Sequence, residues 1–105
     1  MQLLYIIQIK NTNIYKIGIT NNLNKRLSEL QVGNPSELIF VKLWKHPQLK
    51  KIQNYERILH NYYKKSGCLI RGEWFYLSQA DIKYLSKPST IEEQNKLIED
   101  IKKML

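Results

Sequence analysis

Two apolar runs near the start of the chain, residues 3–9 and 14–20, are separated by a polar segment with two asparagines at residues 11–13. β-Branched and aromatic residues dominate both runs, which is typical of β-strands. A short polar segment between two such runs is typical of a tight turn. The pattern therefore predicts a β-hairpin at the N-terminus.

The next segment has leucines at helical spacing, and Asn21 or Asn22 precedes it as a candidate N-cap. The predicted helix runs to residue 30, and its buried stripe consists of Leu23, Leu27 and Leu30. At about 100° per residue Arg26 falls on the edge of this stripe, so we expect it to lie near the core. Gly33 is available for a left-handed cap, and Pro35 prevents the helix from continuing.

A longer amphipathic helix is predicted over residues 48–65, because apolar residues recur there at intervals of three and four. Its stripe consists of Leu49, Ile52, Tyr55, Leu59 and Tyr62. Glu56 projects inside the apolar arc of this helix, where a carboxylate needs a partner. His60 lies one turn later on the same side and can reach Glu56.

The remaining pattern predicts two more strands and two more helices. Residues 38–44 and the aromatic segment 72–77 have the composition of strands. Ser78 is expected to cap a brief helix, and Thr90 with Glu93 forms a capping box for a last helix. The stripe of that last helix consists of Ile91, Leu97, Ile98, Ile101 and Leu105.

These elements predict an α+β fold with a small, mainly antiparallel three-stranded sheet, flanking helices and a C-terminal helix. The chain has 105 residues, which is enough for one core and too few for two. We expect residues 1–80 to form the main unit, and residues 81–105 to form a helical extension packed on the same domain.

The composition favours an anionic partner, since seventeen Lys and Arg residues against nine acidic residues give a net charge of +8. Most of these cations are lysines in a chain also rich in Asn and Ile, a mix that AT-rich coding produces without selection for binding. A single cysteine, Cys68, excludes an internal disulfide and a cysteine-based zinc site.

No apolar stretch approaches the roughly 20 residues that span a membrane, and the first residues lack the basic region of a signal peptide. We therefore expect an intracellular protein without membrane contact, located in the cytoplasm or, for a viral protein, in a compartment of the host cell such as the nucleus.

Five positions have the order and separation of a known nuclease motif. Tyr5 lies in the first predicted strand, the triplet that begins at Lys16 and ends at Gly18 lies in the second, and Arg26 and Glu56 lie on the two helices that follow. On these residues the chain resembles a GIY-YIG nuclease domain, in the small phage-type branch in which Lys-Ile-Gly replaces Tyr-Ile-Gly.

Two further segments resemble signatures of this branch: Leu-Gln-Val-Gly-Asn-Pro at residues 30–35 and Gly-Glu-Trp-Phe at residues 72–75. The resemblance covers residues 1 to about 80. The chain departs from the family pattern at Leu3 and Leu4, which stand where Gly and Ile would precede the tyrosine.

The resemblance implies divalent-metal-dependent hydrolysis of a nucleic-acid phosphodiester, with DNA as the expected substrate. Glu56 would hold one Mg²⁺ or Mn²⁺, and Tyr5 would be the general base or would position the attacking water. A phenol needs a cationic neighbour to lower its pKa for this task, and Lys16 is the expected cation. Arg26 has the planar fork that binds phosphate oxygens. His60 is expected to orient Glu56 or to assist proton transfer.

Each of these residues also has a structural interpretation. Tyr5 fits a core aromatic residue and Lys16 a solvated strand residue. Arg26 is placed to pair with a surface carboxylate such as Glu29, and Glu56 could form a structural ion pair with Arg26 or Lys16. Glu73 is expected to order the turn before the aromatic segment, and a role in the site remains open for it.

Two other functions remain open. One is a catalytically inactive nucleic-acid-binding module with the same scaffold. The other is a protein-interaction or dimerisation domain whose apolar C-terminal helix docks on a partner or a second copy. Specificity for a nucleic acid would come from a partner protein, a homodimer or the shape of the substrate.

Overall fold

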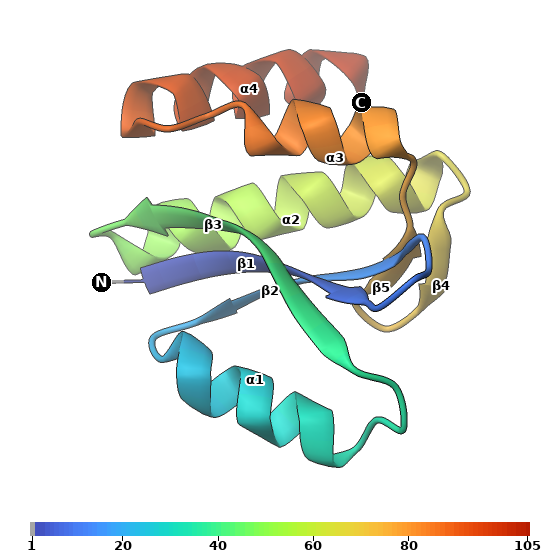
Figure 1. Cartoon of the computed structure of the whole chain (residues 1–105). Helices are drawn as coiled ribbons and strands as arrows, with labels where there is room; N and C mark the ends of the chain where they lie inside the picture. The colour runs from blue at the N-terminus through green and yellow to red at the C-terminus, as the bar shows by residue number, and fades with distance from the viewer. Residues whose placement is uncertain (1) are drawn as a thin grey trace.

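The computed structural model describes residues 2–105 and arranges them as five strands and four helices (Figure 1). In chain order the elements are β1 (Gln2–Ile9), β2 (Ile14–Thr20), α1 (Leu23–Val32), β3 (Leu38–His46), α2 (Leu49–Lys65), β4 (Leu69–Arg71), β5 (Trp74–Tyr76), α3 (Gln79–Ser86) and α4 (Ile91–Met104). In this described part of the chain, no helix is long and apolar enough to cross a membrane.

The strands form one antiparallel sheet in the order β3-β1-β2-β5-β4. The α+β class is confirmed, but the sheet has five strands rather than the predicted three. The difference arises because β4 and β5 form a second hairpin that extends the sheet at β2. The predicted strand over 72–77 is shorter than expected, since Gly72 has a φ of 56° and forms a turn with Glu73.

Helix α2 covers one face of the sheet, and α4 packs on the outer side of α2 (Figure 1). The larger core cluster lies in this half of the molecule. It includes Leu4, Ile6, Ile17, Trp44, Leu59 and Ile98, which are all at most 2% exposed. The indole Nε1 of Trp44 donates a hydrogen bond of 2.9 Å to the carbonyl oxygen of Leu85, which ties β3 to α3.

Helix α1 lies on the opposite face of the sheet (Figure 1). Asn22 caps it by accepting a hydrogen bond from the backbone N–H of Lys25, as its position before the helix predicts. The predicted leucine stripe packs on a smaller cluster around Tyr5, but no residue of α1 is fully buried. The predicted placement of Arg26 near the core is wrong: its side chain is 43% exposed, because the stripe's edge lies outside this shallow contact.

The ends of the other helices agree with the sequence patterns in most details. Ser78 caps α3 in a capping box with Asp81, and the hydroxyl of Thr90 accepts from the backbone N–H of Glu93 at the start of α4. The proposed left-handed cap at Gly33 is wrong, since its φ is −86° and its N–H bonds back to the helix. In α4, Gln94 is buried, whereas Ile91 at the end of the predicted stripe is 40% exposed.

Candidate functional site

The candidate site lies at an open edge of the sheet, where residues from both faces meet. β5 pairs with β2 at Ile14, Tyr15 and Lys16. Among the described residues, the part of β2 from Gly18 onward therefore has β1 on one side and no strand on the other. The charges of Arg26 on α1 and of Glu56 on α2, two helices on opposite faces of the sheet (Figure 1), both act on Tyr5 in β1.

Tyr5 is buried directly opposite Gly18 of the neighbouring strand. A Cβ atom on residue 18 would overlap the phenol oxygen and Cζ of Tyr5, so the ring occupies the space that glycine leaves free. The glycine of the Lys-Ile-Gly triplet is therefore required by the close approach of the Tyr5 ring.

The surroundings of Tyr5 keep its phenol protonated at neutral pH. Burial, followed by the negative charge of Glu73, raises the pKa of Tyr5 to about 12, while the nearby Arg26 acts in the lowering direction. The expectation that Lys16 lies beside Tyr5 and lowers its pKa is wrong. The hairpin register places Ile7 opposite Lys16, and the cation that acts on the phenol is Arg26.

Glu56 lies on the sheet-facing side of α2, as its place in the apolar arc predicts, and its Oε2 atom is buried without a hydrogen-bond partner in the described chain. Burial raises the pKa of the Glu56 carboxyl, the charge of Glu73 raises it further, and His60 and Lys16 act in the opposite direction. The proposed structural ion pair of Glu56 is not formed, since Arg26 pairs with Glu29 and Lys16 with Glu73.

Three ligand atoms, one each from Glu56, His60 and Glu73, lie within 4.8 Å of one another. The first two residues are one turn apart on α2, and Glu73 comes from the turn between β4 and β5. A buried carboxylate oxygen without a protein partner, beside a second carboxylate and an imidazole, is a donor set suited to a divalent cation. The residues therefore fit the metal that the resemblance implies.

The backbone N–H and carbonyl group of Ile17 contact two members of this cluster. Its N–H donates a 3.2 Å hydrogen bond to the carbonyl oxygen of Glu73. Its own carbonyl oxygen lies 2.7 Å from Nε2 of His60. A carbonyl can only accept, so Nε2 is the donor in this contact, and in the neutral imidazole this arrangement leaves the lone pair on Nδ1.

Lys16 points toward the turn rather than toward Tyr5. Its Nζ lies 3.7 Å from a carboxylate oxygen of Glu73 and 5.4 Å from the ring centroid of Trp74. The sequence favoured a role for Glu73 in ordering the turn and left a role in the site open; its carboxylate lies in the cluster. The Gly-Glu-Trp-Phe segment at residues 72–75 was the signal that pointed to it.

Arg26 is the most exposed of the predicted site residues. Its guanidinium lies 3.7 Å from the carboxylate of Glu29, and both side chains are partly exposed to solvent. A surface pair of this kind contributes about 0–1 kcal/mol, so the guanidinium can leave it for a stronger anion.

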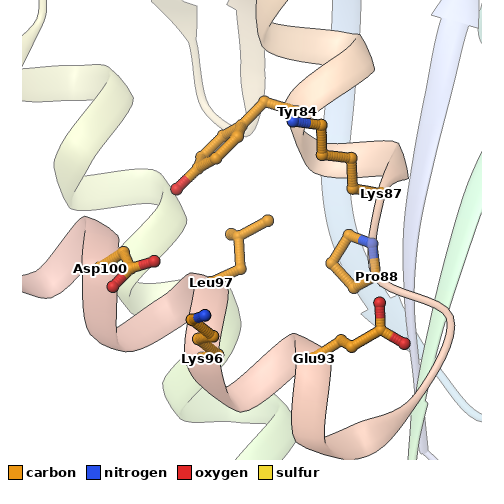
Figure 2. Close-up of a pocket in the computed structure, with 7 residues that line it drawn as sticks. All are labelled: Tyr84, Lys87, Pro88, Glu93, Lys96, Leu97 and Asp100. Atoms are coloured by element: carbon orange, nitrogen blue, oxygen red, sulfur yellow. The ribbon is translucent and has the colours of Figure 1, made fainter.

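A cavity of about 240 Å³ adjoins the cluster and is lined in part by His60, Asn61 and Lys64. A larger cavity of about 370 Å³ lies between α3 and α4 (Figure 2). Its lining consists of Tyr84, Lys87, Pro88, Glu93, Lys96, Leu97 and Asp100. It contains none of the predicted site residues, and its two lysines are matched by two acidic residues, so it offers no net charge for a polyanion.

Comparison with protein families gives one match, since the model of the T5orf172 domain matches residues 2–93. The T5orf172 domain is a phage-associated domain related to nuclease-type folds. The matched range includes Tyr5, Lys16, Arg26, the Glu56–His60 pair and Glu73. The searches of curated proteins and of solved structures found no significant match.

Proposed function

This chain belongs to the T5orf172 domain family, and we propose that it is a divalent-metal-dependent endonuclease of the GIY-YIG type that hydrolyses DNA phosphodiester bonds. The observation that carries the proposal is the buried Oε2 of Glu56, which has no hydrogen-bond partner in residues 2–105. Leaving such a group unpaired costs the folded protein about 1–3 kcal/mol or more. A bound cation removes that cost.

Glu56 would hold Mg²⁺ or Mn²⁺. When bound, such an ion neutralises charge on the phosphate and lowers the pKa of a coordinated water. Glu56 itself is suited to this role because its carboxylate lies beside a second carboxylate and an imidazole, and a cavity lined in part by His60 adjoins this cluster.

Tyr5 positions the attacking water in this proposal. A phenol with a pKa of about 12 keeps its proton at neutral pH, so it acts as a hydrogen-bonding group and not as a free base. Its ring is buried against Gly18, and this packing gives the hydroxyl a defined direction.

The two cationic side chains of the site have different roles. Arg26 binds the non-bridging oxygens of the phosphate, since its pairing with Glu29 is weak and its planar fork matches two oxygens at once. Lys16 is largely shielded from solvent and stays beside Glu73, so it offsets part of the negative charge at the site. The remaining surface charge, within a total of +8, attracts the DNA backbone.

A nicking assay on supercoiled plasmid with Mg²⁺ or Mn²⁺ tests the proposal. We expect wild-type protein to cleave, and Glu56→Gln to lose cleavage while it remains folded by circular dichroism. Glu99→Gln, which changes an exposed carboxylate on α4, is the matched control and is expected to cleave normally. Absence of cleavage with either metal, together with DNA binding that is unchanged in Glu56→Gln, would contradict the nuclease and favour the inactive binding module.

A further inference from the structure

We propose that Glu73 and His60 complete a three-ligand metal site with Glu56, and that this mixed donor set selects a transition ion such as Mn²⁺ over Mg²⁺. The inference rests on the proposed function for the role of the metal, and it goes beyond it in naming two additional ligands and a metal preference. Neither follows from a single glutamate that holds one ion.

The first argument is the convergence of the three side chains. Their ligand atoms lie within 4.8 Å of one another although they come from a helix and a β-turn. All three residues are partly shielded from solvent, with Glu73 having a side chain that is 40% exposed. A separation of this size suits atoms that surround one shared ion, because ligands on opposite sides of a cation lie about twice a metal–ligand distance of roughly 2.0–2.3 Å apart.

The second argument is electrostatic. Two carboxylates are held close together, and the oxygen of Glu56 is buried without a partner. Like charges at this separation repel each other, and each opposes ionisation of the other. Lys16 lies near Glu73 but is not paired with Glu56, so the protein's own cation does not bridge the two acids. A divalent ion between them converts the repulsion into attraction.

The third argument is the hydrogen bond of His60 to Ile17. Metal-binding histidines commonly donate the second ring N–H to a backbone carbonyl, which fixes the ring and leaves the other nitrogen for the ion. His60 has this arrangement, with Nε2 at 2.7 Å from the Ile17 oxygen. The backbone N–H of the same residue, Ile17, donates to the carbonyl oxygen of Glu73. One residue therefore fixes the positions of two proposed ligands.

The donor types determine the preferred ion. Mg²⁺ favours oxygen ligands and keeps most of its water, whereas first-row transition ions accept imidazole readily. Two carboxylates with one imidazole therefore favour Mn²⁺, or a heavier transition ion, over Mg²⁺.

The simplest rival explanation is that Glu73 serves only as the partner of Lys16, and two variants separate the possibilities. Glu73→Gln removes the carboxylate and the pair together. Lys16→Met removes the pair but leaves the carboxylate. If Glu73 is a ligand, Glu73→Gln weakens Mn²⁺ binding about tenfold or more, whereas Lys16→Met leaves it unchanged or strengthens it.

The experiment is a titration of the full chain with Mn²⁺ or Mg²⁺ alone, in which calorimetry measures the affinity. Pulsed electron paramagnetic resonance then reports the ligands of bound Mn²⁺. We expect wild type to bind Mn²⁺ at least about tenfold more tightly than Mg²⁺, and to show ¹⁴N coupling that His60→Asn abolishes. Glu99→Gln is again the control with normal binding. Equal Mn²⁺ affinity in wild type and Glu73→Gln, or an equal loss in Glu73→Gln and Lys16→Met, would overturn the proposal.

The outcomes also separate this inference from the proposed function. If Glu56→Gln abolishes metal binding and plasmid cleavage while Glu73→Gln and His60→Asn change neither, the nuclease stands and the three-ligand site is wrong. If all three ligand variants lose Mn²⁺ and wild type still cleaves no DNA, the site stands and the nuclease is wrong. If wild type binds neither ion, both proposals fail.

Discussion

The two helices that contribute side chains to the candidate site lie on opposite faces of the sheet and are anchored to the core to different extents. Helix α2, which carries Glu56 and His60, has five buried residues in the larger core cluster, whereas α1, which carries Arg26, has none. Full burial of one large apolar side chain stabilises a fold by about 1.5–3 kcal/mol, so α2 is held far more strongly than α1. The two proposed metal ligands on α2, Glu56 and His60, are thus fixed before a substrate arrives, while Arg26 lies on an element that can adjust to a phosphate.

Truncation of one leucine on each helix gives the largest expected contrast. Leu59→Ala in α2 leaves a cavity in the larger core cluster, and should lower the free energy of unfolding by about 2–5 kcal/mol. Leu27→Ala in α1 removes a side chain that is only partly buried, and should cost about 1 kcal/mol. Urea denaturation followed by circular dichroism measures both values. Equal losses of unfolding free energy in the two variants would contradict the stronger anchoring of α2.

Gly18→Ala tests the contact between the strands at the centre of the site. The added methyl group overlaps the Tyr5 phenol, and relief of that overlap should cost about 1–3 kcal/mol of stability. If the nuclease proposal holds, cleavage should also fall, because the phenol is displaced. Gly18→Ala combined with Tyr5→Phe should recover part of the stability but none of the cleavage. A single variant as stable as wild type would show that the ring has room to move.

Glu56→Gln should stabilise the protein while it removes activity. Because burial raises the folded-state pKa of Glu56 above its unfolded value, the charged carboxylate destabilises the fold once the pH exceeds that unfolded value. The gain is discounted for the partial exposure of the side chain, and we expect about 0.5–1 kcal/mol at pH 7 and almost none at pH 4. Thermal unfolding at the two pH values measures it. A stability loss at pH 7 would mean that the carboxylate has a stabilising partner.

Arg26→Ala should have the smallest effect on stability and still impair cleavage. The side chain is exposed and its pairing with Glu29 is weak, so the free energy of unfolding should change by less than about 0.5 kcal/mol. Loss of a charge-stabilising group at the phosphate should slow cleavage about 10²-fold. Glu29→Gln frees the arginine and should leave cleavage unchanged. A cleavage rate in Arg26→Ala equal to that of wild type would show that Arg26 has no role in cleavage.

Local patterns in the chain were sufficient to predict most of the elements. The spacing of apolar residues predicts α2 and α4, and capping residues mark the starts of α1, α3 and α4 within one residue. The N-terminal hairpin and the burial of Glu56 in an apolar arc also follow from periodicity. These features depend on residues within about one helical turn or one β-turn of each other, so the information lies in short segments.

The assembly of the site depended on contacts between distant segments. The second hairpin joins β2 more than fifty residues away along the chain, and this pairing brings the carboxylate of Glu73 to Glu56 and His60. The pKa of Tyr5 likewise depends on how deeply its ring is buried and on charges from three other elements. Residue types and spacing therefore determined which groups are available for chemistry. Strand pairing and depth of burial, which no local pattern encodes, decided which of those groups lie together and in which direction their pKa values shift.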